Sequence, residues 1–429
     1  MLTKFKKKYI GNGDFYRRYL LLAIPMILQN AITNLVSFLD NIMVGQLGTE
    51  QMSGVAIVNQ LIFVYNLAIF GAVSAASIFG AQYFGKGNHK GHMYSFRFKL
   101  YATLFVTGGA ILLFLTKGSA LISLYLTDTV GNGATEVALK YGQEYLAIMM
   151  VGLIPFAVNQ SYATNIKETG QTFIPMLASF VAVGSNALLD YLMIFGIGPF
   201  PKMGVAGAAL ATVIARYIEA LIVIIWAHMH RAKNRYLEGA YTGFGIPFAE
   251  LKAILVKGFP LMMNEVMWAA GMTTVTQCYS VRGLDVVAGL NIASTITNLF
   301  NIVYLQLGSC ISIVVGQYLG AGKLEEAKDA DNKMIVFSVF CCVIMAALMF
   351  VVGGFFPGIY NTSDEIKGLA TQFIAVSAII MPFCAFSHAS YFTLRSGGKT
   401  VVTFLFDSVF TWVIVVPAAY LLAHFTGLG

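Results

Sequence analysis

The sequence has very few charged residues. Of its 429 residues only 11% are Asp, Glu, Lys or Arg, whereas 58% are hydrophobic and the mean hydropathy is +0.74. Soluble proteins carry charge on about a quarter of their residues, so this scarcity excludes a soluble globular fold. Apolar blocks of about 20 residues, long enough to cross a bilayer, recur along the chain. Because β-barrel strands alternate apolar and polar residues instead, the sequence predicts an all-α polytopic membrane protein.

The sequence also lacks motifs typical of enzymes and of metal or nucleotide sites. Its five cysteines fall within predicted spans, without metal-ligand spacing or an extracellular pairing pattern. The stretch GKGNHKG lacks the spacing of a phosphate-binding loop, and no hydrolase or zinc motif is present. The start of the sequence lacks the small-residue cleavage site of a secretory signal peptide. We therefore predict no enzymatic activity, no cofactor and no cleaved leader.

The basic residues predict the topology of these apolar blocks. Most of the 27 Lys and Arg residues precede the first block or fall in alternate loops, which places the N-terminus and those loops in the cytoplasm. The net charge of +7 is therefore a topology signal, and we predict no nucleic-acid partner. We expect a monomeric, multi-pass protein of the cell (inner or plasma) membrane, in contact with its lipids. The predicted helices lie near residues 19–43, 52–77, 98–116, 142–162, 173–197, 205–227, 254–279, 286–311, 334–356, 369–393 and 402–425.

An internal repeat divides the chain into two halves. Residues 80–87 read GAQYFGKG and residues 315–322 read VGQYLGAG, and the same spacing pairs Pro25 with Pro260. Because this spacing covers six helices, both halves have the same orientation, related by a pseudo-two-fold axis along the membrane normal. We predict two six-helix bundles, as an N-terminal lobe at 1–230, a cytoplasmic linker at 231–253 and a C-terminal lobe at 254–429.

The second half is shorter than the first by one predicted helix. The first half closes with GVAGAALATVIARYIEALIVIIW, whereas the sequence ends at AHFTGLG, where the counterpart of that helix would begin. We expect the twelfth helix to be missing, through truncation or an incomplete gene model, and the form with eleven helices to be impaired.

Three carboxylates stand out inside predicted spans, where an ionisable group is costly and usually paired or functional. Asp40 and Asp190 lie similar numbers of residues beyond the basic residues that precede their helices, so both are expected at one level of the outer half. Asn186 lies one turn below Asp190 on the same face, and Tyr145 and Thr212 are expected in the same layer. We predict a cation-coupling site for H⁺ or Na⁺, with Na⁺ held by the oxygens of Asp40, Asn186 and Asp190. A hydrogen-bonded strut between Asp190 and Asn186 is the structural alternative.

Glu265 is the third carboxylate and lies in the inner half of helix 254–279. It either attracts a cationic substrate or faces the cytoplasmic vestibule as a solvated group. Prolines inside spans kink helices, and a kink at Pro25 would link the shape of the first helix to Asp40. Met-rich surfaces suit promiscuous binding. We predict a substrate cleft lined by Glu265, Gln29, Pro25 and Met263.

Basic residues are scarcer still inside the spans. Lys99 and Lys257, at the cytoplasmic ends of their spans, are counted with the adjoining loops, which leaves Arg216 as the only Lys or Arg within a span. We expect Arg216 to pair with Glu219 on the surface of the helix, because residues three apart are neighbours there.

The sequence resembles the bacterial multidrug and toxic compound extrusion (MATE) transporters. The resemblance covers essentially the whole chain and rests on IPMILQN, FLDNIMVGQLG, the paired GAQYFGKG and VGQYLGAG, NALLD, GVAGAALAT and RSGGKT, in this order. It implies two six-helix lobes in a V-shaped fold around a central cleft, with alternating access by rocking of the lobes. It also implies export of amphipathic, often cationic, compounds in exchange for H⁺ or Na⁺.

The resemblance also implies roles for individual residues. The cation site of the family's first lobe matches Asp40, Asn186 and Asp190, together with Tyr145 and Thr212. The acid that one subfamily carries in its seventh helix matches Glu265. That subfamily has a further acid in its tenth helix, but FCAFSHASYFTLRSGG contains none, which favours coupling through the first lobe.

Two other classes of function remain as alternatives to a cation-coupled exporter. A lipid-linked oligosaccharide flippase of the related superfamily would present cationic residues to a pyrophosphate, and the spans offer few. A membrane scaffold or receptor that transports nothing would have no reason to bury aspartates. We therefore predict a secondary active antiporter.

Overall fold

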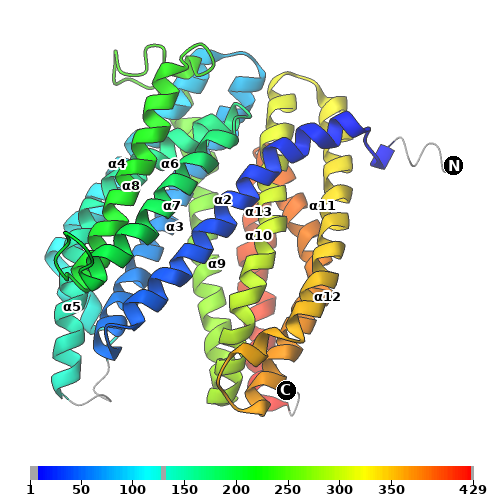
Figure 1. Ribbon diagram of the computed structural model, residues 1–429. Coiled ribbons are helices and arrows are strands. Elements are labelled where there is room, and N and C mark those ends of the chain that lie inside the picture. The colour runs from blue at the N-terminus through cyan, green and yellow to red at the C-terminus, as the bar shows by residue number, and fades with distance from the viewer. Residues whose placement is uncertain (1–7, 127–131, 427–429) are drawn as a thin grey trace. The chain divides into compact units, whose positions relative to one another are not determined.

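The structure, a computed structural model, describes residues 8–126 and 132–426, so the outermost residues of the two predicted lobes lie outside the described part. Every regular element within these residues is helical, and none is a strand (Figure 1). The predicted all-α fold is therefore confirmed.

Each predicted span is occupied by helix. In the first half these are α2 (Gly13–Gly45), α3 (Thr49–Gly85), α4 (His89–Ser123), α5 (Asn132–Val151), α6 (Leu153–Glu168), α7 (Phe173–Phe195) and α8 (Val205–Met229). In the second half they are α9 (Phe248–Ser280), α10 (Leu284–Gly320), α11 (Leu324–Gly353), α12 (Asp364–Ser396) and a last helix made of α13 (Thr400–Phe404), the π-helical turns η3 (Leu405–Val409) and η4 (Thr411–Val415), and α14 (Val416–Phe425). Short 3₁₀ turns occupy η1 (Arg235–Leu237) and η2 (Phe356–Ile359).

The helices that could cross a membrane agree with the predicted spans, with two differences. Among the described residues, nine helices are long and apolar enough to cross a membrane, and the bent pair α5 and α6 makes a tenth. The helix α9 lies outside this set, because Lys257, Asn264 and Glu265 interrupt its apolar run. The span predicted at 142–162 bends by 44° at Gly152. Pro155 explains the bend, since its ring displaces the carbonyl one turn earlier and it has no N–H to donate.

The described residues form two compact units. Unit 2 comprises Leu28–Gly80 and His89–Leu251, and unit 1 comprises Ala81–Asn88 together with the described parts of Met1–Ile27 and Lys252–Gly429. The chain passes from unit 1 to unit 2 within α2 and back to unit 1 within α3. The predicted lobes at 1–230 and 254–429 remain a prediction.

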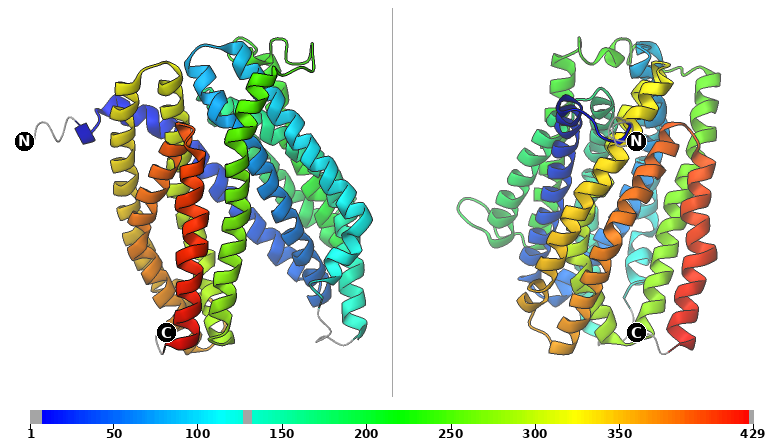
Figure 2. Two further views of the ribbon diagram at one scale, coloured as in Figure 1. Left: turned by 180° about the vertical axis from the view of Figure 1, so that it is seen from behind. Right: turned by 90° about the vertical axis from the view of Figure 1, so that its right-hand side faces the viewer.

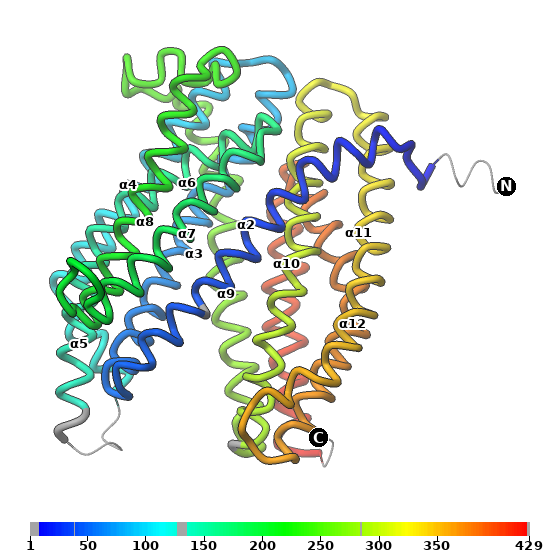
Figure 3. The backbone as a smooth tube through the Cα atoms, in the orientation of Figure 1, coloured from blue at the N-terminus to red at the C-terminus, as the bar shows by residue number. Residues whose placement is uncertain are grey.

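Each unit has its own packed core. In unit 2, α7 packs against α8, and α8 also packs against α5 and α6. In unit 1, α12 packs against both α10 and α11, so that these three helices run side by side (Figures 2 and 3). The buried faces are apolar, as expected for bundles whose helices meet within a membrane.

The repeated motif has a packing role in unit 1. A Cβ on Gly85 would lie 2.0 Å from the carbonyl oxygen of Gln317, and a Cβ on Gly320 would lie 1.9 Å from that of Gln82. The end of α3 and the end of α10 therefore touch backbone to backbone, in a reciprocal contact. Only glycine allows such an approach, which accounts for glycine at the same place in both copies.

The segment that follows α8 is docked on unit 2. The Arg97 guanidinium on α4 donates to three carbonyl oxygens of this segment, those of Gly239 (2.6 Å), Ala240 (2.9 Å) and Gly245 (2.8 Å). Tyr236 of η1 is 1% exposed, with its ring centroid 4.9 Å from that of His92. Burial raises the pKa of Tyr236 well above its usual value, so this phenol stays neutral.

Candidate functional site

Two carboxylates meet inside unit 2. Asp40 on α2 and Asp190 on α7 interact with each other, and Asp190 is only 1% exposed. Within the described residues, Oδ1 of Asp40 and both carboxylate oxygens of Asp190 have no hydrogen-bond partner. Since ionised carboxylates only accept hydrogen bonds, the pair contains no donor of its own. A proton or a bound cation would supply what the pair lacks.

The other residues predicted for this site lie around the two carboxylates. Asn186 is buried one turn before Asp190, and its Nδ2 donates a long hydrogen bond of 3.4 Å to Oγ1 of Thr212 on α8. Tyr145 on α5 is buried close to both carboxylates, and its hydroxyl donates to Oδ1 of Asn59 on α3 at 3.3 Å. The structure thus brings together all five residues predicted for the coupling site, and their role stays a prediction.

Asn59 belongs to the same layer and was not predicted. Asn59 and the neighbouring Gln60 are the polar residues of the otherwise apolar stretch GVAIVNQLIF, and this interruption was the available signal. The layer supplies carboxylate, amide, hydroxyl and phenol oxygens, which suit a proton or Na⁺. The described residues contain no cluster of three His, Cys, Asp or Glu side chains that would hold a metal ion.

The residues predicted to line a substrate cleft fall in both units. Pro25, Met263 and Glu265 belong to unit 1, whereas Gln29 belongs to unit 2. Pro25 lies within the continuous helix α2 and is buried. Glu265 is half-buried, with Oε1 3.9 Å from Nη1 of Arg395 on α12. Whether the four share a cleft stays a prediction.

Unit 1 contains a polar network that the sequence analysis missed. Nδ2 of Asn264, which is 1% exposed, donates to Oδ2 of Asp407 at 2.8 Å. Oγ of Ser408 donates to Oδ1 of the same amide at 2.8 Å. Asp407 lies in the π-helical turn η3 and stands alone in the apolar stretch VVTFLFDSVF. Glu265 is therefore not the only carboxylate inside the helices of the second half.

The basic residues inside the helices correct two further expectations. Arg216 does not pair with Glu219 among the described residues: it donates to the carbonyl oxygen of Gly152 at 3.3 Å and lies 5.0 Å from the ring centroid of Phe156. Nor is Arg216 the only basic side chain there. Lys99 on α4 is fully buried and Arg395 on α12 is 5% exposed.

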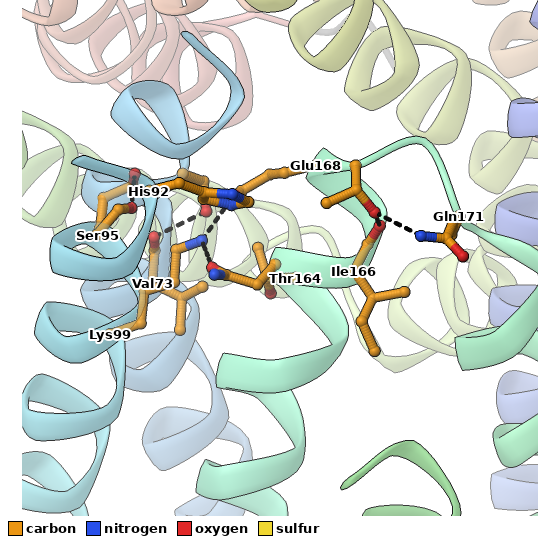
Figure 4. Close-up of polar contacts among 12 residues, drawn as sticks. Val73, His92, Ser95, Lys99, Thr164, Ile166, Glu168 and Gln171 are labelled. Atoms are coloured by element: carbon orange, nitrogen blue, oxygen red, sulfur yellow. Dashed lines mark hydrogen bonds and ion pairs between the residues drawn. The ribbon is translucent and has the colours of Figure 1, made fainter. Parts of the chain in front are cut away.

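Lys99 belongs to a buried cluster where α4 meets the end of α6 (Figure 4). Its Nζ lies 2.5 Å from Oε1 of Glu168 and also donates to Oδ1 of Asn165. Nε2 of His92 lies 3.4 Å from Oε2 of Glu168. This cluster could not be predicted from the sequence, because its members come from two helices that are far apart along the chain.

Comparisons with known proteins agree on one family. The family model described as MatE matches residues 25–192 and 260–421. A probable multidrug resistance protein NorM from Thermotoga maritima is 24% identical over 408 residues, which cover 95% of this chain and 86% of that protein. A second probable multidrug resistance protein NorM, from Listeria monocytogenes serotype 4b, is 25% identical over 420 residues, which cover 97% of this chain and 90% of that protein.

Solved structures show the same fold. One is described as the outward-facing conformation of a multidrug resistance MATE family transporter; its TM-score is 0.85 at 20% identity, with 96% of this chain and 89% of that chain covered. A transporter of the MOP superfamily from Pyrococcus furiosus, described as having a binding pocket of reverse polarity, also reaches 0.85, at 21% identity and 97% and 90% coverage. The predicted MATE-like fold is therefore confirmed.

Proposed function

Because the chain belongs to the MatE family, we propose that it is a secondary active antiporter that exports amphipathic, often cationic, small molecules in exchange for H⁺ or Na⁺. The observation that carries the proposal is the interaction of two carboxylates, Asp40 and Asp190, inside unit 2, with Oδ1 of Asp40 and both oxygens of Asp190 lacking a hydrogen-bond partner among the described residues. The names of the relatives, multidrug resistance proteins, support the class of substrate.

The carboxylate pair provides a physical basis for the exchange. Two unit charges about 4 Å apart repel by about 4 kcal/mol at an effective dielectric constant of about 20. The empty, doubly ionised pair is therefore unfavourable, and one cation relieves the repulsion. A proton, a Na⁺ ion and the cationic group of a substrate all meet this need. If they compete for it, loading a cation from outside displaces the substrate, and alternating access converts this competition into export.

The charges of the other buried groups favour an exporter of cations over a flippase. A lipid-linked oligosaccharide flippase would need cationic side chains free to hold a pyrophosphate. Here Lys99 lies 2.5 Å from Glu168, and Arg395 lies 3.9 Å from Glu265. Both positive charges thus lie beside a carboxylate, and Arg216 is held by the carbonyl oxygen of Gly152 and the ring of Phe156. We propose no enzymatic activity.

Efflux of ethidium from proteoliposomes tests the proposal. A pH gradient and a Na⁺ gradient are imposed separately on wild type, Asp40→Asn and Asp190→Asn, with the exposed Glu238→Gln as a matched control. We expect efflux to need one of the two gradients, and to be lost in both aspartate variants but not in the control. Aspartate variants that fold normally and export at the wild-type rate would refute the mechanism. Efflux indifferent to both gradients would point to a flippase, and lipid-linked sugars would be tried next.

A further inference from the structure

A second carboxylate site lies in unit 2, away from the Asp40 and Asp190 pair. Nε2 of Gln29 on α2 donates to Oγ of Ser179 on α7 at 2.7 Å, and that hydroxyl donates in turn to Oε1 of Glu219 on α8. Asn159 on α6, which is 3% exposed, interacts with the same carboxylate. Four helices thus each contribute one polar side chain to a connected polar cluster around Glu219.

Two acceptor atoms in this cluster are unused. Oε1 of Gln29 and Oδ1 of Asn159 are buried and have no hydrogen-bond partner within the described residues. A buried acceptor without a partner costs free energy, so this cluster lacks a donor or a cation for these two oxygens. A proton on Glu219 would convert the carboxylate into a donor for such an acceptor. A Na⁺ ion would instead bind carboxylate, amide and hydroxyl oxygens together, which are the ligands that hard cations prefer.

The position of this site relates it to the first carboxylate pair. Thr212, Arg216 and Glu219 follow one another along α8, so Glu219 lies about 10 Å beyond Thr212 at 1.5 Å per residue. Arg216 lies between the two levels, and its charge acts on Tyr145 on one side and on Glu219 on the other. The charged groups that act on Glu219 are Lys167 on α6 and Arg216 on its own helix.

The internal repeat gives independent support. The spacing that pairs Pro25 with Pro260 also pairs Gln29 with Asn264. Later in the two halves the repeat continues at a slightly shorter spacing, which pairs Gly170 with Gly398 and also pairs Ser179 with Asp407. Both units therefore use the same contact between helices: Gln29 donates to Ser179 at 2.7 Å in unit 2, and Asn264 donates to Asp407 at 2.8 Å in unit 1. In each, the amide lies in a network that contains a carboxylate.

We propose that Glu219, with Ser179, Asn159 and Gln29, forms a second monovalent-cation site of unit 2, which takes the coupling cation after it leaves Asp40 and Asp190. Glu219 binds the cation, as a proton or as Na⁺, and Ser179 is a positioning residue that orients the carboxylate. The inference rests on the proposed antiport, because it describes a second step of the same cation's path. It also gives a role to Glu219, which would otherwise be a half-buried carboxylate without an ion-pair partner at contact distance in the described part of the chain.

Infrared difference spectroscopy of the purified full chain tests cation binding without relying on transport. Spectra are recorded between low and high pH, and separately with and without Na⁺, for wild type, Glu219→Gln and the exposed Glu238→Gln. For a proton site we expect a protonated-carboxyl band that disappears only in Glu219→Gln. For a Na⁺ site we expect a Na⁺-induced shift of a carboxylate band that disappears only in that variant. If both difference spectra match wild type in Glu219→Gln, the proposal is wrong.

Transport then tests the place of the site in the cation's path. We expect Glu219→Gln to bind ethidium as wild type does, measured by fluorescence anisotropy without a gradient. Its gradient-driven efflux should fall at least about tenfold, the equivalent of one hydrogen bond to a charged group, and Glu219→Asp should recover part of it. Unchanged coupling in Glu219→Gln would overturn the proposal even if wild type behaves as an antiporter. Loss of gradient dependence in wild type would instead overturn the antiport itself.

Ser179→Ala keeps the proposal testable if Glu219→Gln does not fold. Removing the hydroxyl takes away a donor to the ionised form of Glu219, so a proton would be held to higher pH. We expect the pH midpoint of efflux to move up, or the half-saturating Na⁺ concentration to rise, at unchanged ethidium affinity. A purely structural role of Ser179 would lower the amount of folded protein but would leave the midpoint in place, and that result would contradict the proposal.

Discussion

Gly80 of α3 lies directly against the carboxylate of Glu168 at the end of α6. A Cβ on Gly80 would lie 2.0 Å from Oε2 of Glu168, while Lys99 holds Oε1 at 2.5 Å from the other side. The repeat explains why this glycine occurs in only one copy of the motif. The counterpart of Gly80 is Val315, and the spacing that pairs Gly170 with Gly398 makes Ser396 the counterpart of Glu168. Without a carboxylate there, the second copy needs no glycine.

Gly80→Ala should therefore destabilise the protein. The Cβ would force the carboxylate away from Lys99, and overpacking of this kind costs about 1–3 kcal/mol. Unfolding in detergent can be followed with a thiol-reactive dye, because Cys278, Cys310 and Cys342 are buried until the chain unfolds. Gly109→Ala on α4 is the matched control, since a Cβ there meets nothing within 4 Å. Equal unfolding temperatures for the two variants would show that the contact with Glu168 does not matter.

The ion pair of Lys99 with Glu168 should show strong coupling in a double-mutant cycle. Removing one partner of a buried pair leaves a charge without compensation, which costs about 3–5 kcal/mol. Lys99→Met and Glu168→Gln are each expected to lower the unfolding temperature steeply. The double variant should be more stable than either single variant, because no charge is then left unpaired. Additive losses would mean that the two groups do not interact as the 2.5 Å contact indicates.

The features that were predicted correctly are those whose signal lies within one continuous stretch of the sequence. Long apolar runs predict helices whatever their neighbours are, so the spans emerged directly. Asp40 and Asp190 were also foreseen, because depth along a helix can be counted and both were the obvious charges in their spans.

Contacts between side chains of different helices could not be predicted from the sequence. The pairing of Lys99 with Glu168 depends on which faces of α4 and α6 meet, and Lys99 had been counted with the basic residues of a loop. Glu219 was given Arg216 as its partner from spacing along one helix, whereas its hydrogen bond comes from Ser179 on another. Spacing predicts neighbours on one helix but not across the interface.

Tyr236 allows a sharp test of how the segment after α8 is docked. Its hydroxyl is buried without a hydrogen-bond partner in the described residues, while its ring packs against Phe96 and His92. Tyr236→Phe should be neutral or slightly stabilising, because it removes an unsatisfied polar group. Tyr236→Ala should cost about 3–5 kcal/mol, as for other large-to-small changes at buried aromatic residues. Limited proteolysis of residues 231–247 reports the docking.

The same residue gives a pH dependence of known sign. Burial raises the pKa of the Tyr236 phenol well above its usual value, so the folded protein favours the neutral form. Its contribution to docking is complete below the unfolded value of about 10 and is lost as the pH rises beyond it. Proteolysis of the segment should therefore accelerate at strongly alkaline pH in wild type and much less in Tyr236→Phe. Identical alkaline profiles would place the titrating group elsewhere.

The Asp40 and Asp190 pair should make the protein less stable than it could be. When both carboxylates are ionised they repel each other. The Asn186 amide interacts with Asp190, but no donor among the described residues makes a hydrogen bond of normal geometry to either of its oxygens. Asp190→Asn removes one charge and introduces a donor, so it should raise the unfolding temperature at alkaline pH. The gain should shrink as the pH falls, because the wild-type pair then takes up a proton and loses its repulsion. Asp285→Asn, at an exposed position, should show neither effect.

A gain that does not vary with pH would mean that the repulsion is already relieved in the wild type. A loss at every pH would favour Asp190 as a hydrogen-bonded strut with Asn186. A gain in stability accompanied by a loss of coupling would show that the unfavourable pair is kept for function.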